Sequence, residues 1–346
     1  MAKKKGSAPR RYVHIGFPKS ASTSLQNFYF GQREDILHLG NGYNASGNSY
    51  IDEAVETVCE VDVRLKKEVL FDAKRSRAAL TPHFDAAERD GRKAVGISSE
   101  FFCFPLGNEV DTADKARRLH RIMGEGTTAI IIVREQFSLL RSLYLEMVKG
   151  GYGGTYRKFL EYTLLYQVRS WCHDFAFHHL YELYADLFGA DNVVLLPFET
   201  LKHEPAVFLG RLATSLGLPD DTTELRQVNQ QSETKGFYEQ LRRYNQRFPH
   251  EFGGLFYEPF NMNRMRSYFH NELELAVPHD RLADDFVRGP INQAAQRFNQ
   301  ISPLPDIDLN VPKAIEEHFE AIYAPSNAKL ARYIDTDLAK LGYRVA

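Results

Sequence analysis

The sequence predicts an α/β protein in which helices flank one central parallel sheet. Short runs rich in Ile and Val recur along the chain, and segments with the apolar period of a helix separate them. Strands that alternate with helices form parallel sheets covered on both faces. With 346 residues, of which 43% are hydrophobic and 25% charged, the chain can bury a sizeable core. The expected strands are Tyr12–Ile15, Ile36–Leu39, Ala94–Ile97, Thr128–Val133 and Val193–Phe198.

Residues 1–11 are rich in lysine and arginine, but no apolar stretch of useful length follows them. We therefore expect a disordered basic tail rather than a signal peptide. No window approaches the ~20 apolar residues of a membrane span, and a formal net charge of −2 gives no argument for a nucleic-acid partner. Cys59, Cys103 and Cys172 have no paired spacing, which argues against a disulfide framework or a zinc site and fits a reducing, cytoplasmic compartment.

The first expected strand runs directly into a loop and the start of a helix. Gly16 and Pro18 end the strand, and hydroxyl side chains fill most of residues 20–24, where the helix begins. A helix N-terminus offers unpaired N–H groups and a partial positive charge, so hydroxyls beside Lys19 suit a phosphate or sulfate group. Ser and Thr also cap ordinary helices, and it is the lysine that favours an anion site.

A second informative stretch begins where the apolar strand at residues 128–133 runs into Arg134. This position lies at the edge where open parallel sheets bind ligands. A guanidinium group donates two N–H groups to a phosphate, and the hydroxyl of Ser142, two turns into the next helix, can add a third donor. The alternative is that Arg134 is a solvated strand end paired with Glu135 or Glu146.

Together the two stretches resemble motifs of the sulfotransferases that use 3′-phosphoadenosine 5′-phosphosulfate. Residues 18–23, Pro-Lys-Ser-Ala-Ser-Thr, are similar to the 5′-phosphosulfate loop of that family, which reads close to Pro-Lys-Ser-Gly-Thr-Thr. Arg134, Ser142 and Tyr144 keep the spacing of its 3′-phosphate motif. The resemblance extends to residues 193–218, and the C-terminal stretch is similar to the tail of bacterial-type members.

The sequence departs from the family pattern at two positions. Ala21 stands where the family usually has glycine, and if that position needs a positive φ, alanine is strained there. Gln136 stands where the family commonly has proline, which removes a preference for a helix start but no ligand contact.

The resemblance implies a bacterial-type cytoplasmic enzyme with one P-loop-like domain over residues 12–346. We expect residues 40–90, polar at first and then helical in pattern, to form an insertion beside the ligand-binding edge. The implied reaction is in-line transfer of a sulfuryl group from 3′-phosphoadenosine 5′-phosphosulfate to a hydroxyl or an amine, without a metal ion, with Lys19 neutralising the leaving phosphate. The implied donor-binding residues are Lys19, Ser20, Ala21, Ser22, Thr23, Ser24, Arg134 and Ser142.

An acceptor hydroxyl has to lose a proton, so a base is expected. Glu100 is the preferred candidate, because it follows the third strand and the aromatic Phe101 and Phe102 can exclude water and raise its pKa. A serine cap with a nearby glutamate explains the same residues without catalysis. His38, at the end of the second strand, is the alternative base.

The acceptor is expected to be a carbohydrate or a small hydroxylated molecule. The insertion and the stretch Phe248–Phe269 mix aromatic and polar side chains, as pockets for such ligands do. The alternative is that these aromatic residues are core. They are Tyr43, Tyr50, Phe71, Phe84, Phe252, Phe256, Tyr257, Phe260, Tyr268 and Phe269.

Other conspicuous residues carry weaker hypotheses. The histidines at 173, 178 and 179 include no pair four residues apart, so packing and solvent exposure explain them better than a metal site. Lys235-Gly236 and Arg288-Gly289 each resemble, without specificity, a late phosphate contact of some sulfotransferases.

Two other functional classes remain open. A nucleotide or adenylylsulfate kinase also uses a strand–loop–helix phosphate site, but it needs glycines in the loop that are missing here, and a carboxylate for Mg²⁺. A non-catalytic nucleotide-binding protein would bind the donor without turning over any acceptor.

Overall fold

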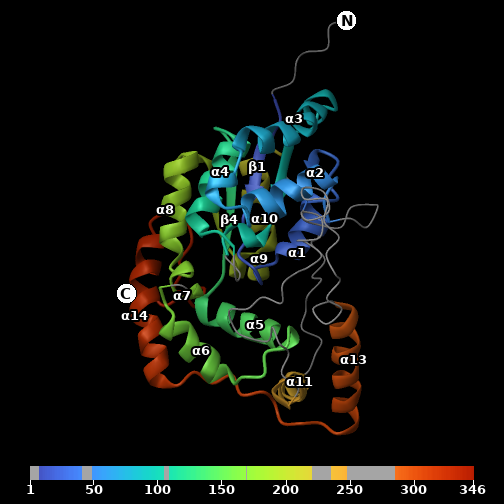
Figure 1. The fold of residues 1–346 in the computed structure, drawn as a ribbon. Coiled ribbons are helices and arrows are strands. Elements are labelled where there is room, and N and C mark those ends of the chain that lie inside the picture. Colours follow the sequence, from blue (N-terminus) through green and yellow to red (C-terminus); the bar gives the residue numbers. More distant parts are fainter. Residues whose placement is uncertain (1–7, 41–48, 105–108, 169, 220–234, 248–284) are drawn as a thin grey trace, which may run out of the picture. The chain divides into compact units, whose positions relative to one another are not determined.

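The computed structural model describes residues 8–40, 49–104, 109–168, 170–219, 235–247 and 285–346 (Figure 1). The chain divides into two compact units. The first comprises Met1–Glu135, Phe177–Val228 and Lys329–Leu341, and the second comprises Gln136–Ala176, Asn229–Ala328 and Gly342–Ala346. The positions of the two units relative to one another are not determined, so the single domain expected over residues 12–346 stays a prediction.

A five-stranded parallel sheet organises the first unit, in the order β2-β3-β1-β4-β5. Its strands are β1 (Arg10–His14), β2 (Ile36–His38), β3 (Ala94–Ser98), β4 (Thr128–Val133) and β5 (Val193–Pro197). All five expected strands are confirmed, and so is the α/β class with a parallel sheet flanked by helices. The first strand begins earlier than expected, because Arg10 pairs with Ala94 and its N–H donates to Lys93 O at 2.8 Å.

Helices of the first unit pack against this sheet. One buried cluster joins Tyr12 of β1 and Ile130 of β4 to Leu25 and Phe208, so that η1 and α10 share a core with the strands. Within the expected insertion, the described residues form α2, η2, η3 and α3. The helices are α1 (Ser22–Ser24), η1 (Leu25–Phe30), α2 (Glu53–Glu56), η2 (Thr57–Val63), η3 (Glu68–Leu70), α3 (Ala73–Arg89), η4 (Glu100–Phe102), α4 (Thr112–Met123), α8 (Phe177–Phe188), η5 (Ala190–Asn192), α9 (Phe198–His203) and α10 (Pro205–Leu216).

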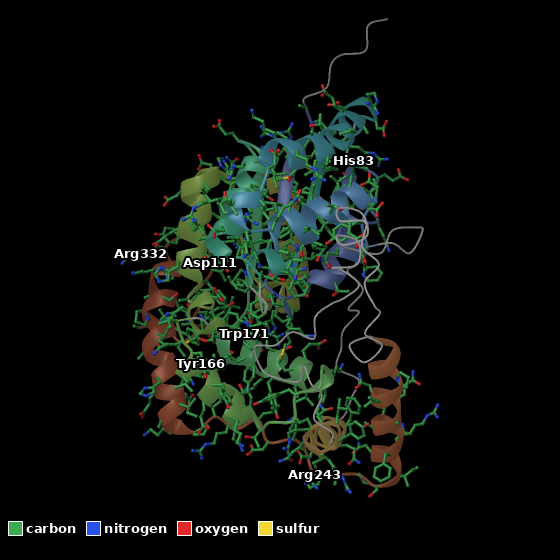
Figure 2. All side chains as sticks on the ribbon, in the orientation of Figure 1. His83, Asp111, Tyr166, Trp171, Arg243 and Arg332 are labelled. Carbon is green, nitrogen blue, oxygen red and sulfur yellow. The ribbon has the colours of Figure 1, made fainter. Side chains whose placement is uncertain are left out.

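The second unit contains helices whose core includes many aromatic side chains. The ring centroids of Trp171 and Phe159 lie 5.7 Å apart. Figure 2 labels Trp171 among the side chains. Phe137 meets Phe319 edge to face, with ring centroids 6.2 Å apart. The helices are α5 (Gln136–Lys149), α6 (Tyr156–Leu165), α7 (Trp171–Asp174), α11 (Lys235–Arg247), α13 (Asp285–Ile301) and α14 (Lys313–Leu330), which ends just beyond the unit boundary. Among the described residues of the chain, no helix is long and apolar enough to cross a membrane.

Candidate active site

The loop at residues 16–24 leaves β1 at the carboxyl edge of the sheet, and the sheet fixes its start. Strand β1 is central, between β3 and β4. Beyond its last residue the backbone keeps bonding to β4, since Ile15 N–H donates to Ile130 O at 3.0 Å and Phe17 N–H donates to Ile132 O at 2.8 Å. This edge is where open parallel sheets bind ligands. The expected anion loop therefore lies at the edge where a ligand site is expected.

Two residues of the loop adopt a left-handed backbone. Lys19 has φ 63° and Ala21 has φ 67°. For a residue with a Cβ this conformation costs roughly 1–2 kcal/mol, so Ala21 carries the strain that a glycine would not. Helix α1 begins directly after Ala21, and Leu25 N–H donates to Ala21 O at 3.0 Å. Such strain persists only where the surroundings hold it, and it concentrates at functional sites.

Ser20 is fully buried, and its hydroxyl has no hydrogen-bond partner among the residues that the structure describes. Leaving a buried hydroxyl unsatisfied costs roughly 1–3 kcal/mol. Its neighbour Ser22 differs, because the Ser22 hydroxyl donates to Phe17 O at 3.1 Å and ties the loop to its own start. Thr23 and Ser24 are half-buried in the short helix α1. An oxyanion bound at the loop would satisfy the Ser20 hydroxyl.

Arg134 contacts this loop directly. It follows β4, and its Nη1 donates to Lys19 O at 2.6 Å across 115 positions of sequence. The guanidinium also lies 4.9 Å from the ring centroid of Phe198. The next peptide is fixed as well, because Glu135 N–H donates to Glu199 Oε1 at 3.0 Å. The structure thus brings together two residues that the two sequence motifs assigned to opposite ends of one nucleotide.

Ser142 belongs to the second unit, as does Tyr144. Ser142 is buried on α5, and the Tyr144 hydroxyl donates to Gly154 O at 3.0 Å. Burial raises the pKa of Tyr144 well above its ordinary value. The joint role of Arg134 and Ser142 at a 3′-phosphate stays a prediction, since the relative position of the two units is not determined.

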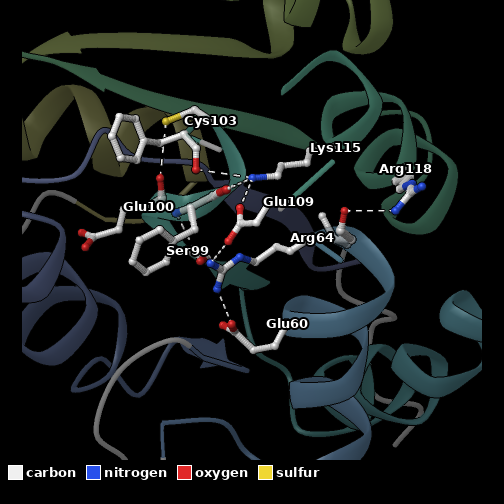
Figure 3. Close-up of polar contacts among 11 residues, drawn as sticks. Glu60, Arg64, Ser99, Glu100, Cys103, Glu109, Lys115 and Arg118 are labelled. Atoms are coloured by element: carbon white, nitrogen blue, oxygen red, sulfur yellow. Dashed lines mark hydrogen bonds and ion pairs between the residues drawn. The ribbon is translucent and has the colours of Figure 1, made fainter. Parts of the chain in front are cut away.

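Glu100 opens η4, immediately after β3, and its backbone lies against the start of the loop. A Cβ placed on Gly16 would come within 3.0 Å of both Glu100 Cα and Glu100 O. The carboxylate of Glu100 points away from the neighbouring ion pairs of Arg64 and Lys115 (Figure 3). Ser99 also caps this turn, because its hydroxyl accepts from Phe101 N–H at 3.4 Å. The serine cap is therefore present, and it holds Glu100 beside the loop.

His38 lies farther from the loop than Glu100 in the strand register. It pairs with Gly96, and Gly96 pairs with Tyr12, whereas Ser98 and His14 form the pair nearer the loop. Its Nδ1 lies 2.7 Å from the Tyr12 hydroxyl. His38 lines a cavity of about 290 Å³ whose lining residues include none of residues 16–24. Of the two candidate bases, Glu100 is the one whose backbone lies against the loop, and the choice between them stays a prediction.

A buried polar network beneath the loop was not anticipated from the sequence. His14, the last residue of β1, places Nδ1 2.7 Å from Ser98 Oγ, and Gln26 Nε2 donates to the same oxygen at 2.9 Å. Burial, together with His38, lowers the pKa of His14 to about 3. Its Nε2 has no hydrogen-bond partner within the described part of the chain. A histidine in an otherwise apolar strand was the available signal.

Gln136, which replaces the proline of the family pattern, also has an unexpected role. It is buried at the start of α5, and its Nε2 donates to Asn327 Oδ1 at 2.7 Å and to Phe175 O at 3.2 Å. Asn327 Nδ2 donates back to Gln136 Oε1 at 3.2 Å. Gln136 thus makes a paired amide contact across 191 positions of sequence.

The histidines at 178 and 179 and the basic residue at 235, which carried the weaker hypotheses, lie on α8 and α11. Donor atoms of His178, His179 and Glu182 lie within 4.8 Å of one another, closer than adjacent helix positions suggested. However, Lys329 Nζ lies 3.4 Å from His178 Nε2, and this ammonium disfavours a metal cation there. Lys235 lies on α11 of the second unit.

The aromatic residues expected at the acceptor site are only partly described. Tyr50, Phe71 and Phe84 are 6%, 8% and 7% exposed, so these three belong to the core. Tyr43, the stretch Phe248–Phe269 and the side chain of Arg288 lie outside what the structure describes.

Comparison with known proteins supports the fold. No family model and no curated protein matches this chain. Among solved structures it is similar to the sulfotransferase from Alicyclobacillus acidocaldarius, at 14% identity and a TM-score of 0.51, covering 97% of this chain and 100% of that chain. The sulfotransferase domain from the Synechococcus PCC 7002 olefin synthase matches at 13% identity and a TM-score of 0.31, covering 88% and 99%. The first likeness concerns the fold alone, and the second, with its TM-score of 0.31, is too weak to support even the fold.

Proposed function

We propose that this chain transfers a sulfuryl group from 3′-phosphoadenosine 5′-phosphosulfate to a hydroxyl of a carbohydrate or small-molecule acceptor. The observation that carries the proposal is the loop at residues 16–24. There the buried hydroxyl of Ser20, which has no hydrogen-bond partner among the described residues, lies between two left-handed residues, and Arg134 donates a hydrogen bond to Lys19 O. The likeness in fold to a solved sulfotransferase supports the same class.

The residues at the loop suit the 5′ end of this co-substrate. The bound donor would supply the sulfuryl group and a phosphate leaving group. Lys19 places a cation where charge grows on that phosphate, which is worth most in the transition state. The buried Ser20 hydroxyl gains an acceptor, and the N-terminus of the helical segment that begins at Ser22 favours an anion.

The other groups have separate tasks in the proposal. Arg134 and Ser142 would recognise the 3′-phosphate that distinguishes this donor from ATP. Glu100 would accept the proton of the acceptor hydroxyl, because its turn lies against the loop start at Gly16. His38 is the alternative base, and its bond to the buried Tyr12 makes it the weaker candidate.

The proposal is tested with ³⁵S-labelled donor, a panel of sugars and small hydroxylated compounds, and an extract of the source of the chain. We expect label to enter a non-polypeptide acceptor in the presence of a chelator, with loss of labelling in Glu100→Gln and retention in His38→Ala. Label in a polypeptide would contradict the acceptor class. A requirement for Mg²⁺ would indicate kinase-like chemistry, and tight donor binding without any turnover would indicate a non-catalytic protein. The reverse pattern in the two variants would make His38 the base.

A further inference from the structure

Four buried charged side chains form a continuous ion chain between η2 and α4: Glu60, Arg64, Glu109 and Lys115 (Figure 3). Their exposed side-chain fractions are 3%, 2%, 2% and 0%. Arg64 joins the two carboxylates, and Lys115 binds the second oxygen of Glu109. Two carboxylates and two cations balance, which is the condition for keeping charges out of water.

The ion chain ends on the turn that carries Glu100. Lys115 Nζ donates to Phe101 O at 2.8 Å and to Phe104 O at 3.4 Å. The Arg64 guanidinium lies 4.3 Å from the centroid of the Phe101 ring. The residue directly after Glu100 is therefore held twice, at its carbonyl by one cation of the ion chain and at its ring by the other.

The turn that carries Glu100 is short, and its described bonds are local. Helix η4 has three residues, and Phe102 N–H donates to Ser99 O at 3.1 Å. Cys103 Sγ donates to Glu100 O at 3.5 Å, a weak bond. A short helix leaves most of its carbonyl groups without partners inside the helix. The ammonium of Lys115 satisfies two of the carbonyl groups of this segment.

We infer that Lys115 is a positioning residue for Glu100, and that the ion chain orients the Glu100 turn beside the loop at residues 16–24. The inference rests on the proposed function, in which Glu100 is the base. Replacing a buried ion network by apolar residues of similar volume is often neutral or stabilising, so stability alone does not account for the network. What it supplies is a directed contact to the carbonyl groups of one turn.

The test needs a variant that folds. Lys115→Met alone leaves two buried carboxylates facing one arginine, and such an uncompensated charge can unfold the chain. The double variant Lys115→Met/Glu109→Gln leaves Glu60 and Arg64 as a balanced pair. Arg118→Met is the matched control, because Arg118 lies on the same helix, is 1% exposed, and donates to Asp62 O and Val63 O instead of the Glu100 turn.

Hydrogen–deuterium exchange measures the turn directly. In the double variant we expect exchange in residues 99–104 to rise at least tenfold, while exchange in residues 16–24 and the Kd for 3′-phosphoadenosine 5′-phosphate stay within twofold. Arg118→Met should leave residues 99–104 unchanged. If exchange in residues 99–104 of the double variant matched that of Arg118→Met, the inference would be overturned. A loss of affinity for 3′-phosphoadenosine 5′-phosphate of tenfold or more in the double variant would overturn it too.

A double-mutant cycle separates this inference from the proposed function. With labelled donor, we expect the double variant to lower kcat at least tenfold with little change in the KM for the donor. In a Glu100→Gln background the same change should have no further effect on kcat. Additive losses would overturn the positioning role. Full turnover in Glu100→Gln alone would instead refute Glu100 as the base, while the exchange result would still report on the turn.

Discussion

The loop at residues 16–24 and the ion chain of Glu60, Arg64, Glu109 and Lys115 both bury polar groups, and the partners of these groups differ. In the ion chain each charge has an opposite charge in direct contact. In the loop, the Ser20 hydroxyl is buried without a partner among the described residues. Buried polar groups normally find partners, so an exception needs an explanation. In the proposed function a bound donor would account for the Ser20 hydroxyl, and in the further inference the ion chain holds a backbone turn.

The two regions also differ in backbone strain. The loop keeps Lys19 and Ala21 at positive φ, and Arg134 holds it at Lys19 O. The ion chain acts on the short turn η4 through carbonyl contacts.

Replacing Lys19 should have the largest effect. We expect Lys19→Ala to lower turnover about 100-fold or more, because removing one group that stabilises developing charge typically costs about 10²–10³ in rate. The half-buried side chain contributes little packing, so the melting temperature should hold. Lys93→Ala, at an exposed lysine of the same unit, is the control. Retained turnover in folded Lys19→Ala would reduce the loop to an ordinary helix cap.

The buried His14, at the end of β1, should make the free energy of unfolding depend on pH. Its pKa is about 3 in the folded chain and 6.5 ordinarily, so between these values the unfolded chain binds more protons. The contribution of His14 to the free energy of unfolding should therefore be fully present above pH 6.5. It should fall as the pH decreases, by about 2 kcal/mol between pH 7 and pH 5. Urea unfolding at both pH values measures the loss.

In this experiment His14→Gln should remove most of that pH dependence. His203→Gln, at an exposed histidine, should leave it unchanged. An identical loss of stability in His14→Gln and in the unmodified chain would show that His14 is not buried in its neutral form.

Relieving the strain at Ala21 should have the smallest effect. Glycine removes a cost of about 1–2 kcal/mol in the left-handed region but adds about 0.4–1 kcal/mol of unfolded-state entropy. We expect Ala21→Gly to raise the free energy of unfolding by about 0.5–1 kcal/mol. Ala78→Gly, at an exposed position inside α3, should lower it by about 1 kcal/mol. The same sign in both variants would contradict the strain at Ala21.

The sheet and the loop could be predicted because their signals are local. Strands of a parallel sheet are buried on both faces and form continuous apolar runs, as Thr128–Val133 does with the bounds expected. The loop residues are consecutive, so hydroxyls, lysine and helix start stand together in the sequence. Even the strain at Ala21 followed from one departure from a family motif.

The ion chain and the amide pair could not be predicted, because distant segments assemble them. Arg64 and Glu109 are 45 positions apart, and Gln136 and Asn327 are 191 apart. The local sequence around a charged residue of a helix is the same whether the charge faces solvent or an opposite charge in the core. Only tertiary structure shows that Lys115 is fully buried.

The affinity of the unmodified chain for 3′-phosphoadenosine 5′-phosphate and for AMP, measured by calorimetry in one buffer, tests the central claim most directly. The account predicts at least tenfold tighter binding of the 3′-phosphorylated nucleotide, since a charge-assisted contact is worth about 1.5–3 kcal/mol. Arg134→Ala should remove most of that preference. Because Arg134 also donates to Lys19 O, its loss can weaken the binding of both nucleotides, so the ratio of the two affinities is the quantity to compare. Equal affinity of the unmodified chain for the two nucleotides would contradict the account.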